Sequence, residues 1–482
     1  MMYSDAFISA VFCPPTGAWE GVPDRLSDSV FQTLKEIGVN RIFAYGMDDR
    51  PETVERTFRQ CEKYQIGYLP CVPASREYLR ILPGDNGEKP WDALTEEEKD
   101  ALDDRFVQQI RRYTSYPAFA GITFTDECGY LAFDGVAHAK RVFDKKFPGY
   151  EFHANFFSYS ISDEIFWGGM AFHGRPDALD AMQLPFSLSG DLEIKFENRF
   201  RYYDRLVEGL LSKAPFEVIS QDKYPFEEFW PTVPTSVHTA LFELNAYFKL
   251  KSMKYRSRFY NFMQVGQWFK AGRRMTFGEM ALQINVTVAY GAAGFAWFPG
   301  VFPLDWRNEE AMAEGRNGGA AFIDMSGNPT QFVPWVKALN DFMKPFACDL
   351  LESTLLGVAS YGVYDNGFNW ETVKTLPDSE CIYHGQLPDM LRYTESGLKA
   401  QCSNQIMVAT FVNNGKKRYY VVNLSSVYDN TVKLTLPGTG YEVQEMDRAY
   451  FIDSTIETTL KPGCALFIDH KGEKSEKITP NL

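Results

Sequence analysis

The strongest constraint on the fold is an alternation of short apolar runs with amphipathic stretches, which continues to about residue 345. Eight runs rich in β-branched and aromatic residues are typical of strands, over residues 6–12, 40–46, 66–72, 119–125, 150–157, 216–221, 258–265 and 294–298. Strands that alternate with helices pair in parallel, because a parallel connection needs a crossover. Eight such units predict an α/β fold, a closed (β/α)8 TIM barrel.

The pattern changes after a helix expected near residues 333–343. Runs with period-2 alternation follow at residues 405–412, 418–425, 431–437, 440–446 and 465–470, and turns containing Gly or Pro separate several of them. This pattern is typical of an antiparallel β-sandwich. We therefore expect two domains, a barrel over residues 1–348 and a β-sandwich over residues 349–482.

Two of the expected helices carry start signals. Thr95 is followed three residues later by Glu98, and Thr276 in the same way by Glu279. In such a capping box the hydroxyl and the carboxylate each bind a backbone N–H of the first turn. The pattern therefore favours a structural role for Glu279 over a catalytic one.

Charge and composition exclude several classes of function. The chain has 49 Lys and Arg against 63 Asp and Glu, a formal charge of −14, so we expect neither a nucleic-acid nor a membrane partner. The charge-free stretch 284–304 contains three glycines and two prolines, which favours a helix end, a turn and a buried strand over a membrane span. The first residues lack a basic n-region, so we expect a cytoplasmic protein. The eight cysteines and six histidines show no metal-ligand or disulfide spacing, and no phosphate-binding motif occurs, so we expect no metal and no cofactor.

The candidate catalytic residues follow the fourth and sixth strands, because the active site of a TIM barrel lies at the C-terminal ends of its strands. The fourth strand runs into Asp126 and Glu127, and two adjacent carboxylates at the end of a buried strand are costly to desolvate. Side chains alternate along a strand, so only one of the pair is expected to face the axis. We favour Glu127 as the acid, with Asp126 bracing it, and Asp222 after the sixth strand as the second carboxylate.

Polar and aromatic residues at other strand ends are expected to bind substrate. These residues are Asn155, Tyr224, Gln264, Trp268 and Trp297, with Trp297 as a flat platform at the rim. His153 is expected to be a core or hydrogen-bonded residue. Lys223 leaves open a different chemistry, a lyase that forms a Schiff base.

Three segments resemble barrel glycoside hydrolases of clan A that are related to the β-galactosidases of families 42 and 35. They are YPAFAGITFTDECGY from residue 116, SQDKYPF from residue 220 and RRMTFGEMALQINVTVAYGAAGFAWF from residue 273. The terminal sandwich also resembles the accessory domain of that group. The resemblance implies that Glu127 is the acid/base. Asp126 stands where the usual motif has Asn, and the nucleophilic Glu of strand 7 has no counterpart, since no acid occurs between Ser257 and Met275.

A second similarity, to chitinase-like barrels, also places an acid at Glu127. There Ala120, Thr123 and Thr125 replace the aspartates of the motif, so hydrolysis assisted by an N-acetyl group of the substrate is not favoured.

These observations predict an exo-acting glycoside hydrolase with a carbohydrate substrate. A carbohydrate-binding barrel without activity and the lyase stay open as alternatives, and so does assembly into a homo-oligomer. Aromatic residues make up 15% of the chain. We expect one set of rings to gather at the catalytic end of the barrel around Glu127, namely Trp19, Trp167, Trp230, Trp268, Trp297 and Trp306.

Overall fold

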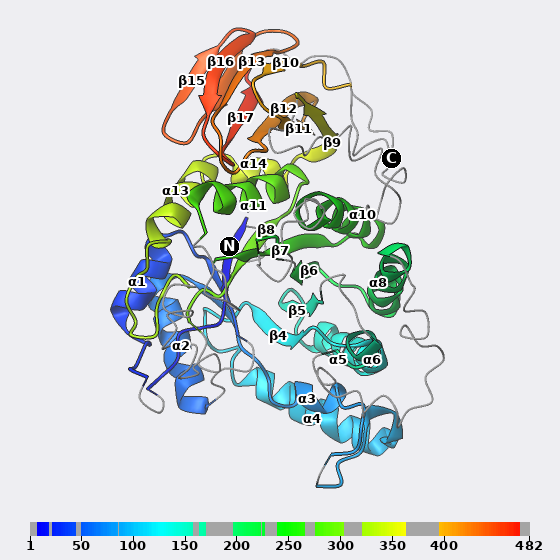
Figure 1. Cartoon of the computed structure of the whole chain (residues 1–482). Helices are drawn as coiled ribbons and strands as arrows, with labels where there is room; N and C mark the ends of the chain where they lie inside the picture. The colour runs from blue at the N-terminus through cyan, green and yellow to red at the C-terminus, as the bar shows by residue number, and fades with distance from the viewer. Residues whose placement is uncertain are drawn as a thin grey trace.

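The structure, a computed structural model, describes residues 7–18, 22–44, 50–84, 86–157, 163–169, 196–222, 224–226, 239–265, 275–302, 321–362 and 395–472. For residues 163–165, 196–202 and 239–240 only the backbone is described. Within these ranges the chain forms a barrel surrounded by helices and, at one side of it, a smaller region built of antiparallel strands (Figure 1).

Eight parallel strands form the barrel. They are β1 (Ile8–Phe12), β2 (Arg41–Phe43), β3 (Gly67–Leu69), β4 (Gly121–Asp126), β5 (Glu151–Phe156), β6 (Val218–Asp222), β7 (Arg258–Gln264) and β8 (Gly294–Phe298). The sheet order is β3-β2-β1-β8-β7-β6-β5-β4, and the parallel bridges Tyr68 to Phe119 and Cys71 to Thr123 connect its two ends. The predicted (β/α)8 barrel is therefore confirmed.

Helices cover the outside of the barrel (Figure 1). They are α1 (Asp28–Glu36), α2 (Pro51–Tyr64), α3 (Ser75–Tyr78), α4 (Glu96–Arg111), α5 (Phe133–Lys146), α6 (Asp163–Gly168), α8 (Phe196–Leu211), α10 (Leu244–Tyr255), α11 (Phe277–Ala289), α13 (Val333–Met343) and α14 (Ala347–Leu351). Both predicted capping boxes are present: the Thr276 hydroxyl accepts from Glu279 N at 3.2 Å, and Glu279 Oε2 accepts from Thr276 N at 2.9 Å. Glu279 is buried in this cap.

The C-terminal strands form two antiparallel sheets. One has the order β15-β14-β17-β12-β11-β9 and the other β10-β13-β16. The strands are β9 (Thr354–Tyr361), β10 (Lys399–Cys402), β11 (Ile406–Asn413), β12 (Lys416–Asn423), β13 (Asn430–Thr435), β14 (Tyr441–Gln444), β15 (Ala449–Ile452), β16 (Thr455–Leu460) and β17 (Ala465–His470). A separate apolar core that includes Val408, Val421 and Val432 joins the two sheets, so the predicted β-sandwich is also confirmed.

Helix α11 lies between the barrel and the sandwich, and most of its residues are buried. Asn285 on this helix accepts a hydrogen bond from the Tyr420 hydroxyl at 2.6 Å and donates to the carbonyl of Gly463 at 2.8 Å. These contacts explain the charge-free stretch of the sequence, because α11 and β8 are both enclosed by protein. In the described part of the chain, no helix is long and apolar enough to cross a membrane.

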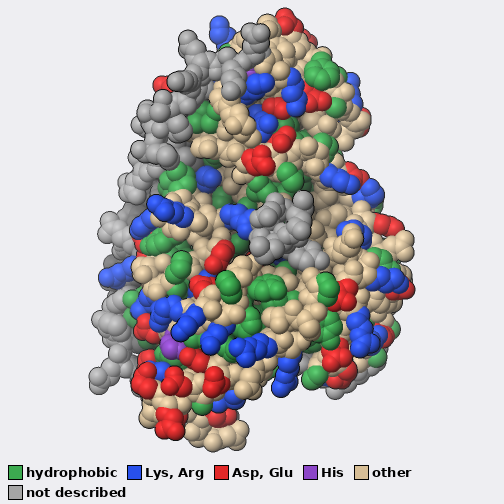
Figure 2. Space-filling model, turned by 180° about the vertical axis from the view of Figure 1, so that it is seen from behind, with side chains coloured by type: hydrophobic (Ala, Val, Ile, Leu, Met, Phe, Trp, Pro, Cys, Tyr) green, Lys and Arg blue, Asp and Glu red, His purple; other side chains and the backbone are tan. Residues whose placement is uncertain are grey.

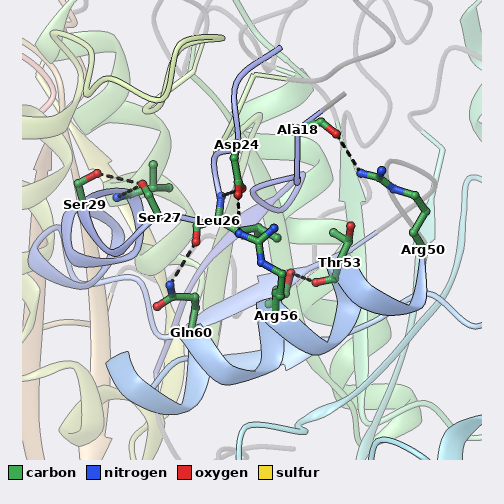
Figure 3. A network of polar contacts seen from close by, with 11 residues as sticks. Ala18, Asp24, Leu26, Ser27, Ser29, Arg50, Thr53, Arg56 and Gln60 are labelled. Carbon is green, nitrogen blue, oxygen red and sulfur yellow. Dashed lines mark hydrogen bonds and ion pairs between the residues drawn. The ribbon is translucent and has the colours of Figure 1, made fainter. Parts of the chain in front are cut away.

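Two surface features complete the fold. The loop after β1 is tied to α2 by an ion pair between Asp24 and Arg56 (2.5 Å) and by a hydrogen bond from Gln60 to the Leu26 carbonyl at 3.2 Å (Figure 3). On the face seen in Figure 2, Lys and Arg side chains are interspersed with Asp and Glu rather than gathered into one basic patch.

Candidate active site

The end of β4 departs from regular strand geometry. The register between β4 and β5 shifts between Thr123 and Thr125, and Glu127 has a φ of 51°, in the left-handed region. Glu127 N donates to the Asn155 carbonyl at 3.0 Å, which holds this conformation against β5. The expected alternation of side chains is therefore wrong at this point. A shifted register followed by a left-handed residue lets the side chains of Asp126 and Glu127 enter the same site.

Three carboxyl groups meet at the mouth of the barrel. The side chain of Glu127 forms a hydrogen bond with that of Asp222, and the charge of Asp126 also acts on Glu127. All three residues keep partial solvent exposure. Two carboxyl groups can form such a bond only when one of them is protonated, because ionised carboxylates offer no donor.

The proton lies on Glu127. Burial, followed by the nearby charges of Asp222 and Asp126, raises the pKa of Glu127 well above its ordinary value. Burial also raises the pKa of Asp126 to about 6, although a hydrogen bond from Asn155 Nδ2 to Asp126 Oδ1 (3.0 Å) opposes that rise. A protonated carboxyl group beside an ionised one can supply the proton donor and the proton acceptor of general acid-base catalysis.

Tyr224 lies beside the three carboxyl groups, in the loop after β6. Burial, followed by the charges of Asp222, Asp126 and Glu127, raises the pKa of its phenol well above the ordinary value, so the hydroxyl stays protonated and can donate a hydrogen bond. Its ring stacks on Phe298, with centroids 5.7 Å apart and an interplanar angle of 22°.

Gln264 braces the same loop. Its Oε1 accepts from the backbone N–H of Phe226 at 2.9 Å, and its side chain is buried. The end of β7 therefore contributes an amide that holds the chain after Asp222, and this contact occupies the side-chain oxygen of Gln264, a residue that we expected to bind substrate.

Trp297 requires a correction. It is fully buried on the outer side of the barrel, where it packs edge-on against Phe295 and Phe322. Its neighbour Phe298 instead belongs to the core inside the barrel, together with Ala296. Successive residues of a strand face opposite sides, so the ring at the rim is Phe298, a residue that the period-2 pattern of β8 could have identified.

Of the remaining predicted tryptophans, only Trp167 lies within the described residues. Trp167 is buried and packs against Tyr130 and Phe166, with centroids 5.6 and 4.9 Å away. Trp268 and Lys223 lie outside the described residues, as do Trp19, Trp230 and Trp306.

Sequence reasoning also missed a polar chain inside the barrel. His153 is buried and hydrogen-bonded, as expected, and its partner at 3.0 Å is Ser220 Oγ. Ser220 in turn donates to Asn155 Oδ1 at 2.8 Å. As for metals, the described residues contain no group of three or more His, Cys, Asp or Glu side chains suited to hold an ion.

Comparison with known proteins connects the fold, but not the sequence, to solved structures. No protein-family model matches the chain, and no curated protein matches it. A family 39 glycoside hydrolase from the gut symbiont Bacteroides cellulosilyticus WH2 is similar in structure, with a TM-score of 0.51 and 11% identity over 98% of this chain and 82% of its own.

Two further solved structures are similar at lower scores. A noncanonic maltogenic α-amylase from Thermotoga neapolitana has a TM-score of 0.47 and 8% identity over 98% of this chain and 99% of its own. A β-galactosidase from the psychrophilic Marinomonas ef1 has a TM-score of 0.45 and 10% identity over 72% of this chain and 62% of its own. At these identities the likeness concerns the fold alone.

Proposed function

We propose that this protein is a glycoside hydrolase in which Glu127 is the general acid and Asp222 the second carboxylate. The observation that carries the proposal is the hydrogen-bonded pair of Glu127 and Asp222 at the C-terminal ends of β4 and β6. Cleavage of a glycosidic bond needs one protonated carboxyl group for the leaving oxygen and one ionised carboxylate for the opposite face of the sugar.

In this reaction Glu127 donates its proton to the glycosidic oxygen, and Asp222 acts either as nucleophile or as base toward water. Glycosidases hold their two carboxyl groups about 5 Å apart when they retain the anomeric configuration and roughly 6.5 to 9.5 Å apart when they invert it. We infer that, when substrate binds, its glycosidic oxygen replaces Asp222 as the acceptor of the Glu127 proton.

The neighbouring side chains suit the recognition of a sugar. Asn155 and Asp126 offer a donor and an acceptor in a fixed orientation, 3.0 Å apart. The Tyr224 hydroxyl adds a donor, and the partly exposed ring of Phe298 adds an apolar face at the rim. Trp268 stays part of the proposal, and so do exo action, a cytoplasmic location and assembly into homo-oligomers.

The test is a pair of variants, Glu127→Gln and Asp222→Ala, assayed on a panel of aryl glycosides and oligosaccharides. Loss of Glu127 should slow substrates with poor leaving groups far more than activated aryl glycosides, because only the former need the proton. Azide should restore turnover in Asp222→Ala if that residue is the nucleophile. Glu98→Gln, a carboxyl-to-amide change in the exposed cap of α4, is the matched control. Unchanged turnover of every substrate by Glu127→Gln would contradict the assignment.

A carbohydrate-binding barrel without turnover is the second candidate. It is favoured by β7, which ends in Gln264 where the related glycoside hydrolases that the sequence resembles carry their nucleophile. Calorimetric binding of a sugar by the wild-type protein, with no product from any glycan of the panel, would support this candidate.

A further inference from the structure

Four polar side chains form a continuous hydrogen-bonded chain from the interior of the barrel to its mouth. Nε2 of His153 lies 3.0 Å from Ser220 Oγ, Ser220 Oγ donates to Asn155 Oδ1 at 2.8 Å, and Asn155 Nδ2 donates to Asp126 Oδ1 at 3.0 Å. His153 and Asn155 are on β5, Ser220 is on β6, and Asp126 ends β4. Three neighbouring strands therefore contribute to one chain.

In this hydrogen-bonded chain every donor points the same way, from His153 toward Asp126. Ser220 has one hydroxyl proton and uses it on Asn155, so its oxygen must accept from His153, which therefore carries its proton on Nε2. Asn155 could present either end of its amide to Asp126. With Oδ1 held by the Ser220 hydroxyl, only the NH2 end faces the carboxylate. A flipped amide would instead set its oxygen against the oxygen of Asp126.

His153 is built into the interior as a neutral ring. It is fully buried and stacks on Phe43 with centroids 4.3 Å apart, with Phe262 at 6.1 Å. Burial, and to a lesser degree the charge of Arg41, lower its pKa to about 3. A neutral imidazole has only one N–H, and no described residue binds its Nδ1. His153 can therefore act only as a donor toward Ser220.

We propose that His153 and Ser220 are positioning residues that hold the Asn155 amide with its NH2 end on Asp126, so that Asp126 is ionised and the proton of the site resides on Glu127. This inference rests on the proposed function in one respect, the use of Glu127 as the acid. Neither residue touches the reacting groups, and both act through Asn155.

The hydrogen bond from Asn155 opposes protonation of Asp126 in a cluster of titratable groups. Glu127 and Cys128 follow it in the chain, Tyr224 faces it from the loop after β6, and Asp222 acts on the same cluster through Glu127. Burial favours the protonated form of Asp126, and the bond from Asn155 is the interaction found to oppose it among the described residues. Weakening that bond should therefore raise the pKa of Asp126.

The test is Ser220→Ala, read by infrared titration of protein labelled with ¹³C at its aspartate carboxyl groups, with Asp126→Asn used to identify the Asp126 band. Loss of a hydrogen bond of ordinary strength from Asn155 to Asp126 corresponds to a rise in the pKa of Asp126 of about 0.5 to 1, which is the rise expected in Ser220→Ala. Ser220→Thr keeps the hydroxyl and should restore the wild-type value.

Thr123→Val is the matched control. It removes a buried hydroxyl of the same barrel, which donates to the Leu69 carbonyl at 3.1 Å and takes no part in the hydrogen bonds from His153 to Asp126. This variant should therefore lower stability without changing the pKa of Asp126. His153→Phe keeps the stack on Phe43 and provides a second variant if Ser220→Ala does not fold. Its expected effect is a smaller rise in the pKa of Asp126.

The outcomes separate this inference from the proposed function. An unchanged Asp126 titration in folded Ser220→Ala, or in His153→Phe should the former not fold, would overturn the positioning role. A rise in the pKa of Asp126 supports that role even if no glycoside is hydrolysed, because the titration does not depend on turnover. In that case the proposed function alone would fail.

Discussion

Replacing Asp222 with Asn should change the stability of the protein in a way that depends on pH. The charge of Asp222 is one of the causes that raise the pKa of Glu127 above its ordinary value of 4.5. The folded-state pKa of Glu127 is higher than its pKa in the unfolded chain, so between these two pKa values the folded protein binds more protons than the unfolded chain. The contribution of Glu127 to stability is therefore greatest below the unfolded-state pKa, and it is lost as pH rises from that value to the folded-state pKa. Without the charge of residue 222 the folded-state pKa of Glu127 is lower, so less stability is lost as pH rises.

The magnitude follows from Coulomb's law. Hydrogen-bonded carboxyl groups have charge centres about 4 to 5 Å apart, which corresponds to roughly 3 to 4 kcal/mol at an effective dielectric constant of about 20. Both groups are partly exposed to solvent, so screening reduces this value, and we expect about 1 to 3 kcal/mol. The pKa of Glu127 should fall toward its ordinary value, because the charge of residue 222 no longer opposes ionisation. The new amide can donate to the Glu127 carboxylate, which preserves the contact in the ionised state.

The assay is chemical denaturation of wild type and Asp222→Asn at pH 4, pH 7 and pH 9. The variant should gain about 1 to 3 kcal/mol relative to wild type between pH 4 and pH 9, because the difference is fully expressed only above the folded-state pKa of Glu127 in both proteins. Comparing differences in this way removes any effect of the substitution that does not depend on pH. Asp469→Asn is the matched control, because Asp469 is buried but paired with Arg418 at 2.8 Å, so its loss should destabilise the protein at pH 7. If Asp222→Asn shows no gain, or a loss, between pH 4 and pH 9, Glu127 and Asp222 do not share a proton.

Three further predictions concern the support of the site. Gly169→Ala should abolish activity and lower the melting temperature, because Gly169 has a φ of 60° and an added Cβ would lie 2.2 Å from the Glu127 carbonyl oxygen; a wild-type melting curve would refute this. Phe298→Ala should raise KM with little change in kcat, because it removes the ring under Tyr224, and steady-state kinetics on an aryl glycoside test this. Thr276→Ala should cost about 1 kcal/mol in urea unfolding through loss of the α11 cap, whereas Glu279→Gln, which can keep the cap, should cost less.

The sequence by itself determined the elements and their order. Hydrophobic periods of 2 and 3.6 residues, capping boxes and turns are local properties, and they identified the eight barrel strands, the change to an antiparallel sandwich and the role of Glu279. They also pointed to Asp126, Glu127 and Asp222, because carboxylates at the ends of buried strands stand out in any sequence. The structure brings these three side chains together.

Only the tertiary structure decided how the side chains meet. A register shift and one left-handed residue send both Asp126 and Glu127 into the mouth, against the alternation expected of a strand. At the end of β8 the packing of the outer core turns Trp297 away from the site. The orientation of Asn155 depends on hydrogen bonds to residues 29 and 65 positions away in the chain. Such contacts are made between strands distant in sequence, and no local pattern encodes them.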